Sequence, residues 1–156
     1  MKELLQSKDK VIREIENAFS HVKLGNGIGL WEAQAIDDYA SNEEQKLARD
    51  KDEKKDWKSL NSNVLQKCNS SLSFFDAEGM KFHLPAFIIA SMNNTNMLDP
   101  IFHLTYLSSY TKEQLSALNT IQRKAIITYL KWCLSNIDYE FEHNNIEIAL
   151  NLYWEK

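Results

Sequence analysis

Apolar residues recur along most of the chain at the spacing of an α-helix. The clearest early example is the run of Ile12, Ile15 and Phe19, which share one helical face and predict a first helix over residues 7–22. Ser7 is suited to cap it, because a serine hydroxyl accepts from amides of the first turn. Similar spacing predicts further helices from residue 30, over residues 101–107 and 120–135, and from residue 144.

The segment around residues 72–84 breaks this pattern. Two short runs rich in β-forming residues flank the tetrapeptide 76–79, which starts with Asp76 and ends with Gly79. An aspartate that opens a turn and a glycine at its left-handed end are typical of a hairpin loop. We therefore expect a short β-hairpin here, with Pro85 in the first turn of a central helix over residues 85–92.

The expected fold class is mainly α (α+β), with one compact domain over residues 1–156 and one short β-hairpin near residues 72–84. The length of 156 residues suits a single domain. Residues 25–29 contain three glycines, but they match no phosphate-binding motif and follow no predicted strand. They are interpreted as a flexible connection between two helices. Residues 42–58 mix charges densely, which is typical of a solvated helix face or an exposed loop.

The formal net charge of −4 is concentrated at one end of the chain. Residues 1–137 contain 17 acidic and 17 basic side chains, so the whole excess lies within residues 138–156. Nucleic-acid binding requires a basic face for the phosphates, and this distribution argues against it.

Other bulk features predict a cytoplasmic protein without a membrane segment. The longest apolar run, residues 84–90, is far too short to cross a bilayer, and the first residues lack the apolar core of a secretory signal. Cys68 and Cys133 are widely spaced within helical patterns, which indicates reduced, buried thiols. We expect no cofactor and no metal site.

Asp76, Glu78 and His83 are the best catalytic candidates. Two carboxylates near a turn with an imidazole a few residues later can bind a metal or exchange protons. The turn itself, however, requires Asp76 and Gly79, and three ligands from one hairpin lack the spacing of known metal motifs. No catalytic residue is therefore predicted, and the remaining histidines are scattered along the chain.

The C-terminal end combines acidic and aromatic residues. The residues predicted to form a partner-binding surface are Asp138, Glu140, Glu142, Glu147 and Trp154. Carboxylates speed encounter with a basic protein, and tryptophan is favoured in binding hot spots. A solvated acidic helix end is the alternative interpretation.

Residues 74–88, Phe-Phe-Asp-Ala-Glu-Gly-Met-Lys-Phe-His-Leu-Pro-Ala-Phe-Ile, resemble the central segment of a family of small bacterial proteins classed as a domain of unknown function. Shorter pieces between residues 18 and 154 are similar in order and spacing. The residues that carry the central motif are Phe74, Phe75, Asp76, Glu78, Gly79, Phe82 and Pro85. The resemblance implies one complete domain and no established activity.

Three functions remain open from the sequence. The first is a non-catalytic partner-binding protein of the immunity or inhibitor type, which neutralises a basic protein such as a toxin through its acidic C-terminal surface. The second is a small enzyme that uses Asp76, Glu78 and His83. The third is a structural subunit that oligomerises.

Overall fold

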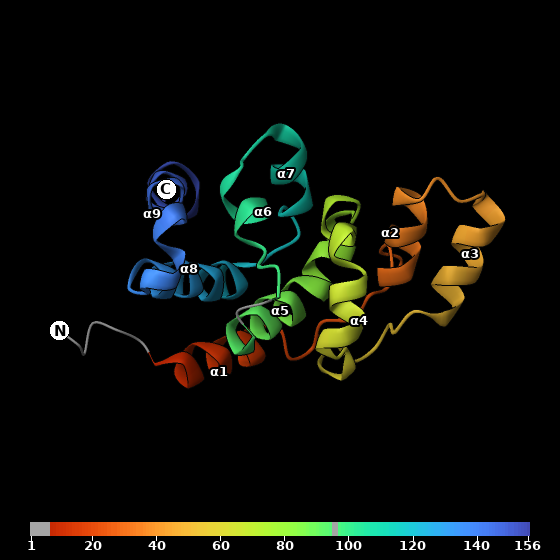
Figure 1. Ribbon diagram of the computed structural model, residues 1–156, viewed down its shortest axis with the longest axis horizontal. Helices are drawn as coiled ribbons and strands as arrows, with labels where there is room; N and C mark the ends of the chain where they lie inside the picture. The colour runs from red at the N-terminus through yellow and green to blue at the C-terminus, as the bar shows by residue number, and fades with distance from the viewer. Residues whose placement is uncertain (1–6, 95–96) are drawn as a thin grey trace.

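The computed structural model describes residues 7–94 and 97–156, and within them every regular element is helical. Figure 1 shows the arrangement. The helices are α1 (Lys8–Ala18), α2 (Leu30–Asp37), α3 (Asn42–Lys51), α4 (Ser62–Lys67), α5 (Ala77–Asn93), α6 (Ile101–Thr105), α7 (Ser109–Gln114), α8 (Thr120–Leu134) and α9 (His143–Ala149). The 3₁₀ turns η2 (Trp57–Ser59), η3 (Asn69–Ser73) and η4 (Ile137–Glu142) and the π-helical turn η5 (Leu150–Trp154) lie between or after them.

Helix α5 occupies the centre of the molecule. Eleven of its seventeen residues are buried, and it packs against α1, α4, α7 and η2. Its apolar residues point in all directions, as expected for a helix that is surrounded by others. Buried side chains from Val11 to Trp154 join it in one hydrophobic core, so the mainly helical expectation is confirmed.

The β-hairpin predicted near residues 72–84 is wrong. The first run begins in the 3₁₀ turn η3 and continues into the connection before α5, and the second run lies inside α5. Asp76 does not open a hairpin loop; its Oδ1 accepts from the amide of Gly79 at 2.9 Å and caps α5. An isolated two-stranded hairpin is marginal in water, whereas the helix buries Met80, Phe82 and Leu84 completely.

Pro85 is also placed differently from the prediction. It lies in the middle of α5, where its ring nitrogen cannot donate to the carbonyl of Lys81, a defect of about 3 kcal/mol in a helix interior. Burial of the apolar residues on both sides, such as Leu84 and Phe87, outweighs that defect.

The predicted cap of the first helix is confirmed, and α8 is also capped at its start. The Ser7 hydroxyl accepts from Lys10 at 3.2 Å, although α1 ends at Ala18, earlier than expected. Asn119 and Gln122 form a reciprocal capping box at the start of α8.

The glycine-rich connection between α1 and α2 is fixed by hydrogen bonds. The Arg49 guanidinium donates to the carbonyls of Gly27 and Gly25 at 2.7 and 2.8 Å. From the other side, Asp76 Oδ1 accepts from the amide of Ile28 at 2.9 Å. The segment is a helix–helix connection, as predicted, but it is tied to both α3 and α5.

Helix α3 is held to the molecule by charged side chains. It has no buried residue, in keeping with the solvated helix face expected for residues 42–58. The buried carboxylate of Asp52, just after α3, accepts from the amides of Trp31 and Glu32 at 2.7 and 3.1 Å. It thereby caps α2 from outside that helix, and α2 and α3 pack side by side.

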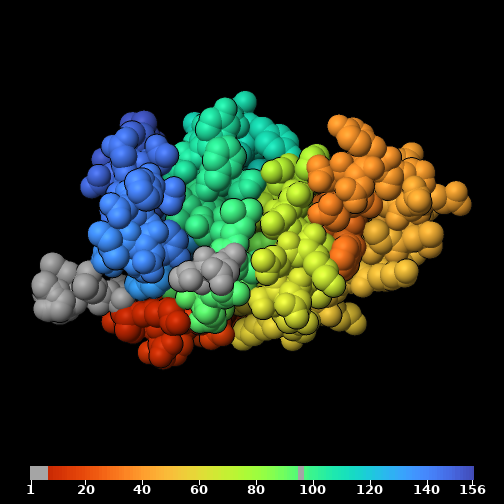
Figure 2. Space-filling model, in the orientation of Figure 1, coloured from red at the N-terminus to blue at the C-terminus, as the bar shows by residue number. Residues whose placement is uncertain are grey.

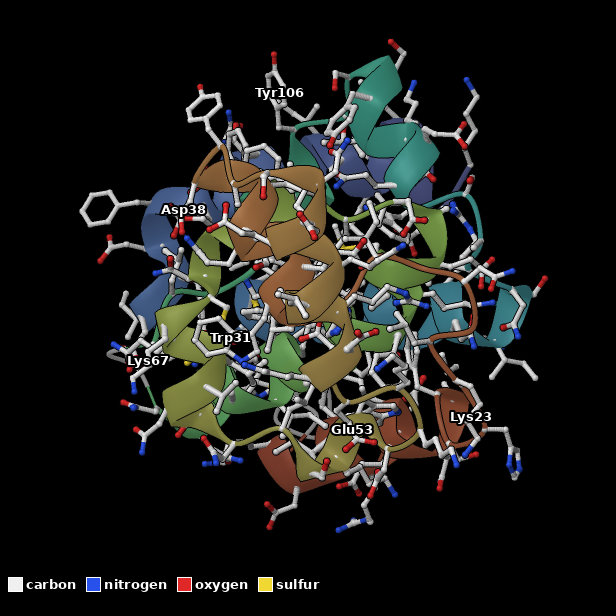
Figure 3. All side chains as sticks on the ribbon, turned by 90° about the vertical axis from the view of Figure 1, so that its right-hand side faces the viewer. Lys23, Trp31, Asp38, Glu53, Lys67 and Tyr106 are labelled. Carbon is white, nitrogen blue, oxygen red and sulfur yellow. The ribbon has the colours of Figure 1, made fainter. Side chains whose placement is uncertain are left out.

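The α2–α3 pair and the C-terminal helices lie at opposite ends of the longest axis (Figures 1 and 2). Figure 3 looks onto the α2–α3 end, where Trp31 and Asp38 are labelled. Within the described residues, no helix is long and apolar enough to span a membrane.

Candidate protein-interaction surface

The C-terminal surface is built on the chain after α8. Asn136 caps η4 by accepting from the amide of Asp138 at 2.9 Å. The Nε2–H of His143 then donates to the carbonyls of Cys133 and Asn136, at 3.0 and 3.1 Å. These bonds attach the start of α9 to the end of α8 and fix the direction in which the last helix projects.

Four carboxylates lie along η4 and α9. Asp138, Glu140 and Glu147 are exposed and Glu142 is half-buried. Among the residues that the structure describes, none of the four forms an ion pair. Glu155 differs, because its Oε2 lies 2.8 Å from Lys131 Nζ. Four of the five acidic side chains at the C-terminal end therefore have no ion pair within the described residues.

Besides Ile137, which is 73% exposed, three large apolar side chains on this stretch are exposed to solvent. Phe141 is 88% exposed, Leu152 67% and Ile148 48%. Ile148 and Leu152 share a face because they are four residues apart, and both line one groove. Phe141 precedes α9, in the 3₁₀ turn η4. Phe141, Ile148 and Leu152 are called the C-terminal stripe below.

Ile148 and Leu152 were not found from the sequence, although their four-residue spacing was a usable signal. The buried face of the last helix contains Ile146 and Leu150, and the stripe is a second apolar face offset from it. A helix with apolar residues on two faces has more of them than one core contact needs. Such a surplus leaves apolar side chains exposed at this end of the chain.

Trp154, predicted to belong to the partner-binding surface, is buried and does not. Its indole Nε1 donates to the carbonyl of Leu104 at 2.8 Å, and the Arg123 guanidinium lies 4.9 Å from its ring centre. Arg123 also covers the ring of Tyr153, at 4.6 Å. Trp154 thus anchors the chain end against α6 and α8, and the exposed ring of the surface is Phe141.

The candidate catalytic residues Asp76, Glu78 and His83 do not converge. Asp76 is engaged as the cap of α5, and Glu78 points to solvent and lies 3.5 Å from Lys81. His83 is fully buried and stacks on Phe75, with ring centres 4.3 Å apart. No cleft joins the three side chains, and among the described residues no group of histidine, cysteine and acidic side chains is arranged to hold a metal ion.

Burial keeps His83 neutral. Removal from solvent lowers the pKa of His83 to about 4, while its Nδ1–H donates to the carbonyl of Gly79 at 2.7 Å. The Nε2 atom is buried without a hydrogen-bond partner. An imidazole that is inaccessible and uncharged at neutral pH is not placed to exchange protons with a substrate.

The family-motif residues have packing roles in this structure. Phe75 and Phe82 are buried in the core, Phe74 packs against it, and Pro85 lies inside α5. Gly79 passes so close to the glycine-rich connection that a Cβ atom would lie 2.5 Å from the carbonyl oxygen of Ile28. The motif therefore joins α5 to the α1–α2 connection.

Both cysteines are free and buried, as expected. Burial raises the pKa of Cys68 to about 12 and raises the pKa of Cys133 as well, so neither is a reactive thiolate at neutral pH.

Comparison with known proteins gives one match. The model of the "Family of unknown function (DUF6714)" matches residues 7–156. No curated protein and no solved structure matches the chain.

Proposed function

Because the chain belongs to DUF6714, a family of unknown function, we propose a function from its surface: it is a non-catalytic protein that binds a basic protein partner through its C-terminal end. The resemblance found in the sequence is confirmed at the level of this family. The observation that carries the proposal is the C-terminal stripe, with Phe141 at 88% exposure among unpaired carboxylates.

The stripe supports binding because exposed apolar side chains gain free energy when a partner covers them. Full burial of a phenylalanine, isoleucine or leucine side chain contributes about 1.5–3 kcal/mol. Exposed apolar groups that cluster and are rimmed by polar residues are typical of interaction sites.

The rim supports a basic partner. Asp138, Glu140 and Glu147 form no ion pair within the described residues, so a partner's lysines and arginines complete the charge balance. Complementary charge mainly speeds association and selects the partner. An immunity or inhibitor protein that neutralises a basic toxin in the bacterial cytoplasm fits this chemistry.

A second copy of the chain fits less well. A symmetric dimer would place each stripe against its own equivalent and bring Glu140 and Glu147 close to the same residues of the other copy. Like charges at such an interface oppose association.

Affinity capture from the source cells tests the proposal. We expect the wild-type protein to retain one basic protein, and the variant Phe141→Ser/Ile148→Ser/Leu152→Ser to lose it. With the purified partner, the variant should bind at least about a hundredfold more weakly, since three contacts are removed. The matched control is Tyr39→Ser/Leu47→Ser, which removes exposed apolar side chains from the α2–α3 end.

Equal capture by the wild type and the stripe variant would overturn the proposal. A stable dimer that the stripe variant loses in light scattering would also overturn it, because the stripe would then bind a second copy.

A further inference from the structure

A hollow lies beside the C-terminal stripe, where α8 meets α9 and η5. Its volume is about 500 Å³, which is within the range of sites that take a small molecule or a long side chain. Leu134 and Ile148 contribute apolar walls, and Asn144, Glu147 and Asn151 contribute polar groups. Ile148 also belongs to the stripe, so a partner that covers the stripe reaches this hollow.

The charges in the hollow favour one cation from outside. Glu155 is neutralised by Lys131, 2.8 Å away, and both line the hollow. Glu147 lines it too and has no ion pair among the described residues. One carboxylate is therefore left to pair with an incoming group.

The opposite flank of Ile148 has different chemistry. A smaller groove of about 240 Å³ lies there, lined by Leu107, Lys112, Leu152 and Tyr153 among others. Its charged side chain is Lys112, which repels a cation. The partner must therefore present its cation on the α8 side of the stripe and apolar groups on the α6–α7 side.

We propose that the hollow receives an arginine side chain of the basic partner, whose guanidinium pairs with Glu147. This inference rests on the proposed function. Arginine fits better than lysine, because its planar fork bonds to a carboxylate through two N–H groups and leaves donors for the amide oxygens of Asn144 and Asn151. Its aliphatic stem lies along Ile148 and Leu134, as long basic side chains do on apolar surfaces.

A synthetic peptide tests the site directly. The probe is an amphipathic helical peptide with leucines along one face and arginines along its flanks, and the matched probe has citrulline in place of arginine. Citrulline has nearly the same shape without the charge. By fluorescence anisotropy, the wild-type protein should bind the arginine peptide at least about fivefold more tightly than the citrulline peptide, the discrimination expected of one charged contact.

The variant Glu147→Gln should lose this preference, while the control Glu43→Gln should keep it. Glu43 is exposed on α3 at the other end of the molecule, so both variants change the net charge equally. The double comparison isolates the coupling between the arginine and Glu147 from general attraction to an acidic protein. Lys131→Gln should tighten binding of the arginine peptide about two- to fivefold, because it frees Glu155 and removes a competing cation.

An equal preference for arginine in the wild-type protein and in Glu147→Gln would overturn the inference. If the stripe variant nevertheless lost the captured partner, the proposed function would stand without this arginine site. If Glu147 and the arginine were coupled but the stripe variant still captured the partner, the proposed function would fail and the arginine site would remain.

Discussion

At the scale of single residues, His83 is a buried side chain whose protonation opposes the fold. It is buried against Phe75 and Phe82, and its neighbouring charged group is Asp76. The folded-state pKa of about 4 lies below the ordinary value of 6.5, so the folded state favours neutral imidazole. The contribution of neutral His83 to the free energy of unfolding is complete above pH 6.5 and is lost as the pH falls toward 4.

We expect this loss to reach about 3 kcal/mol in the free energy of unfolding, or about 1.4 kcal/mol per pH unit. Urea denaturation at several pH values from 7.5 to 4.5 measures it. The variant His83→Asn keeps a donor for the carbonyl of Gly79 but does not titrate, so its curve should be flatter by this amount. Burial raises the pKa of Asp52 and Asp99, which contribute with the opposite sign in both proteins. Parallel curves for the two proteins would contradict the prediction.

Tyr39 illustrates backbone strain at an exposed position. Its φ of 58° is left-handed, and the side chain is 95% exposed. It follows α2 at the position where glycine is preferred, with the amides of Tyr39 and Ala40 donating to the carbonyls of Ile36 and Ala35.

Tyr39→Gly should therefore raise the free energy of unfolding by about 1 kcal/mol, because glycine adopts this conformation without a Cβ clash. Tyr39→Ala keeps the Cβ atom and should gain little of this. Thermal or urea unfolding of the two variants separates the explanations, since equal gains would attribute the effect to the exposed ring.

At the scale of elements, the junction between α5 and the α1–α2 connection is the tightest contact in the family motif. Gly79→Ala forces a Cβ atom against the carbonyl of Ile28, and we expect a loss of about 1–3 kcal/mol in urea denaturation. Gly25→Ala is the matched comparison: its Cβ meets nothing within 4 Å, but its φ of 57° is left-handed, which predicts a loss of about 1 kcal/mol. If both variants lost the same amount, close packing at Gly79 would not be the cause.

Helical spacing and caps predicted the elements with one apolar face, such as α1 and α8. They placed residues 85–92 in a central helix, as observed, but missed the first half of α5, because a helix that is buried on every side has no periodic polar face to reveal it. Its Phe and Leu residues then appeared as strands, and Pro85 as a helix start. Tertiary packing determines that this segment is helical, and no local pattern in the sequence contains that information.

The candidate surface was only partly predictable for a similar reason. The positions of the carboxylates can be read from the sequence, and exposure is the usual state of charged side chains. The burial of Trp154 depends on the carbonyl of Leu104, fifty residues earlier. Proximity to the chain end therefore says little about exposure.

At the scale of the whole molecule, charge and apolar exposure coincide at the C-terminal end. Glu140→Lys/Glu147→Lys brings the formal net charge from −4 to zero without touching a buried group. We expect the melting temperature to stay within the change that corresponds to about 0.5 kcal/mol, because neither carboxylate has an internal partner. Partner association should nevertheless slow and lose its dependence on salt, measured by stopped flow. A large fall in melting temperature would show that these carboxylates stabilise the fold.

Helix α3 is attached to the molecule by polar contacts, and their temperature dependence differs from that of the hydrophobic core. Burial of apolar surface weakens on cooling, because the driving force has a large heat capacity. Arg49 and Asp52 hold α3 with almost no such burial, so cooling should loosen the core before this end. Temperature should therefore separate the α3 end from the core in the order in which they unfold.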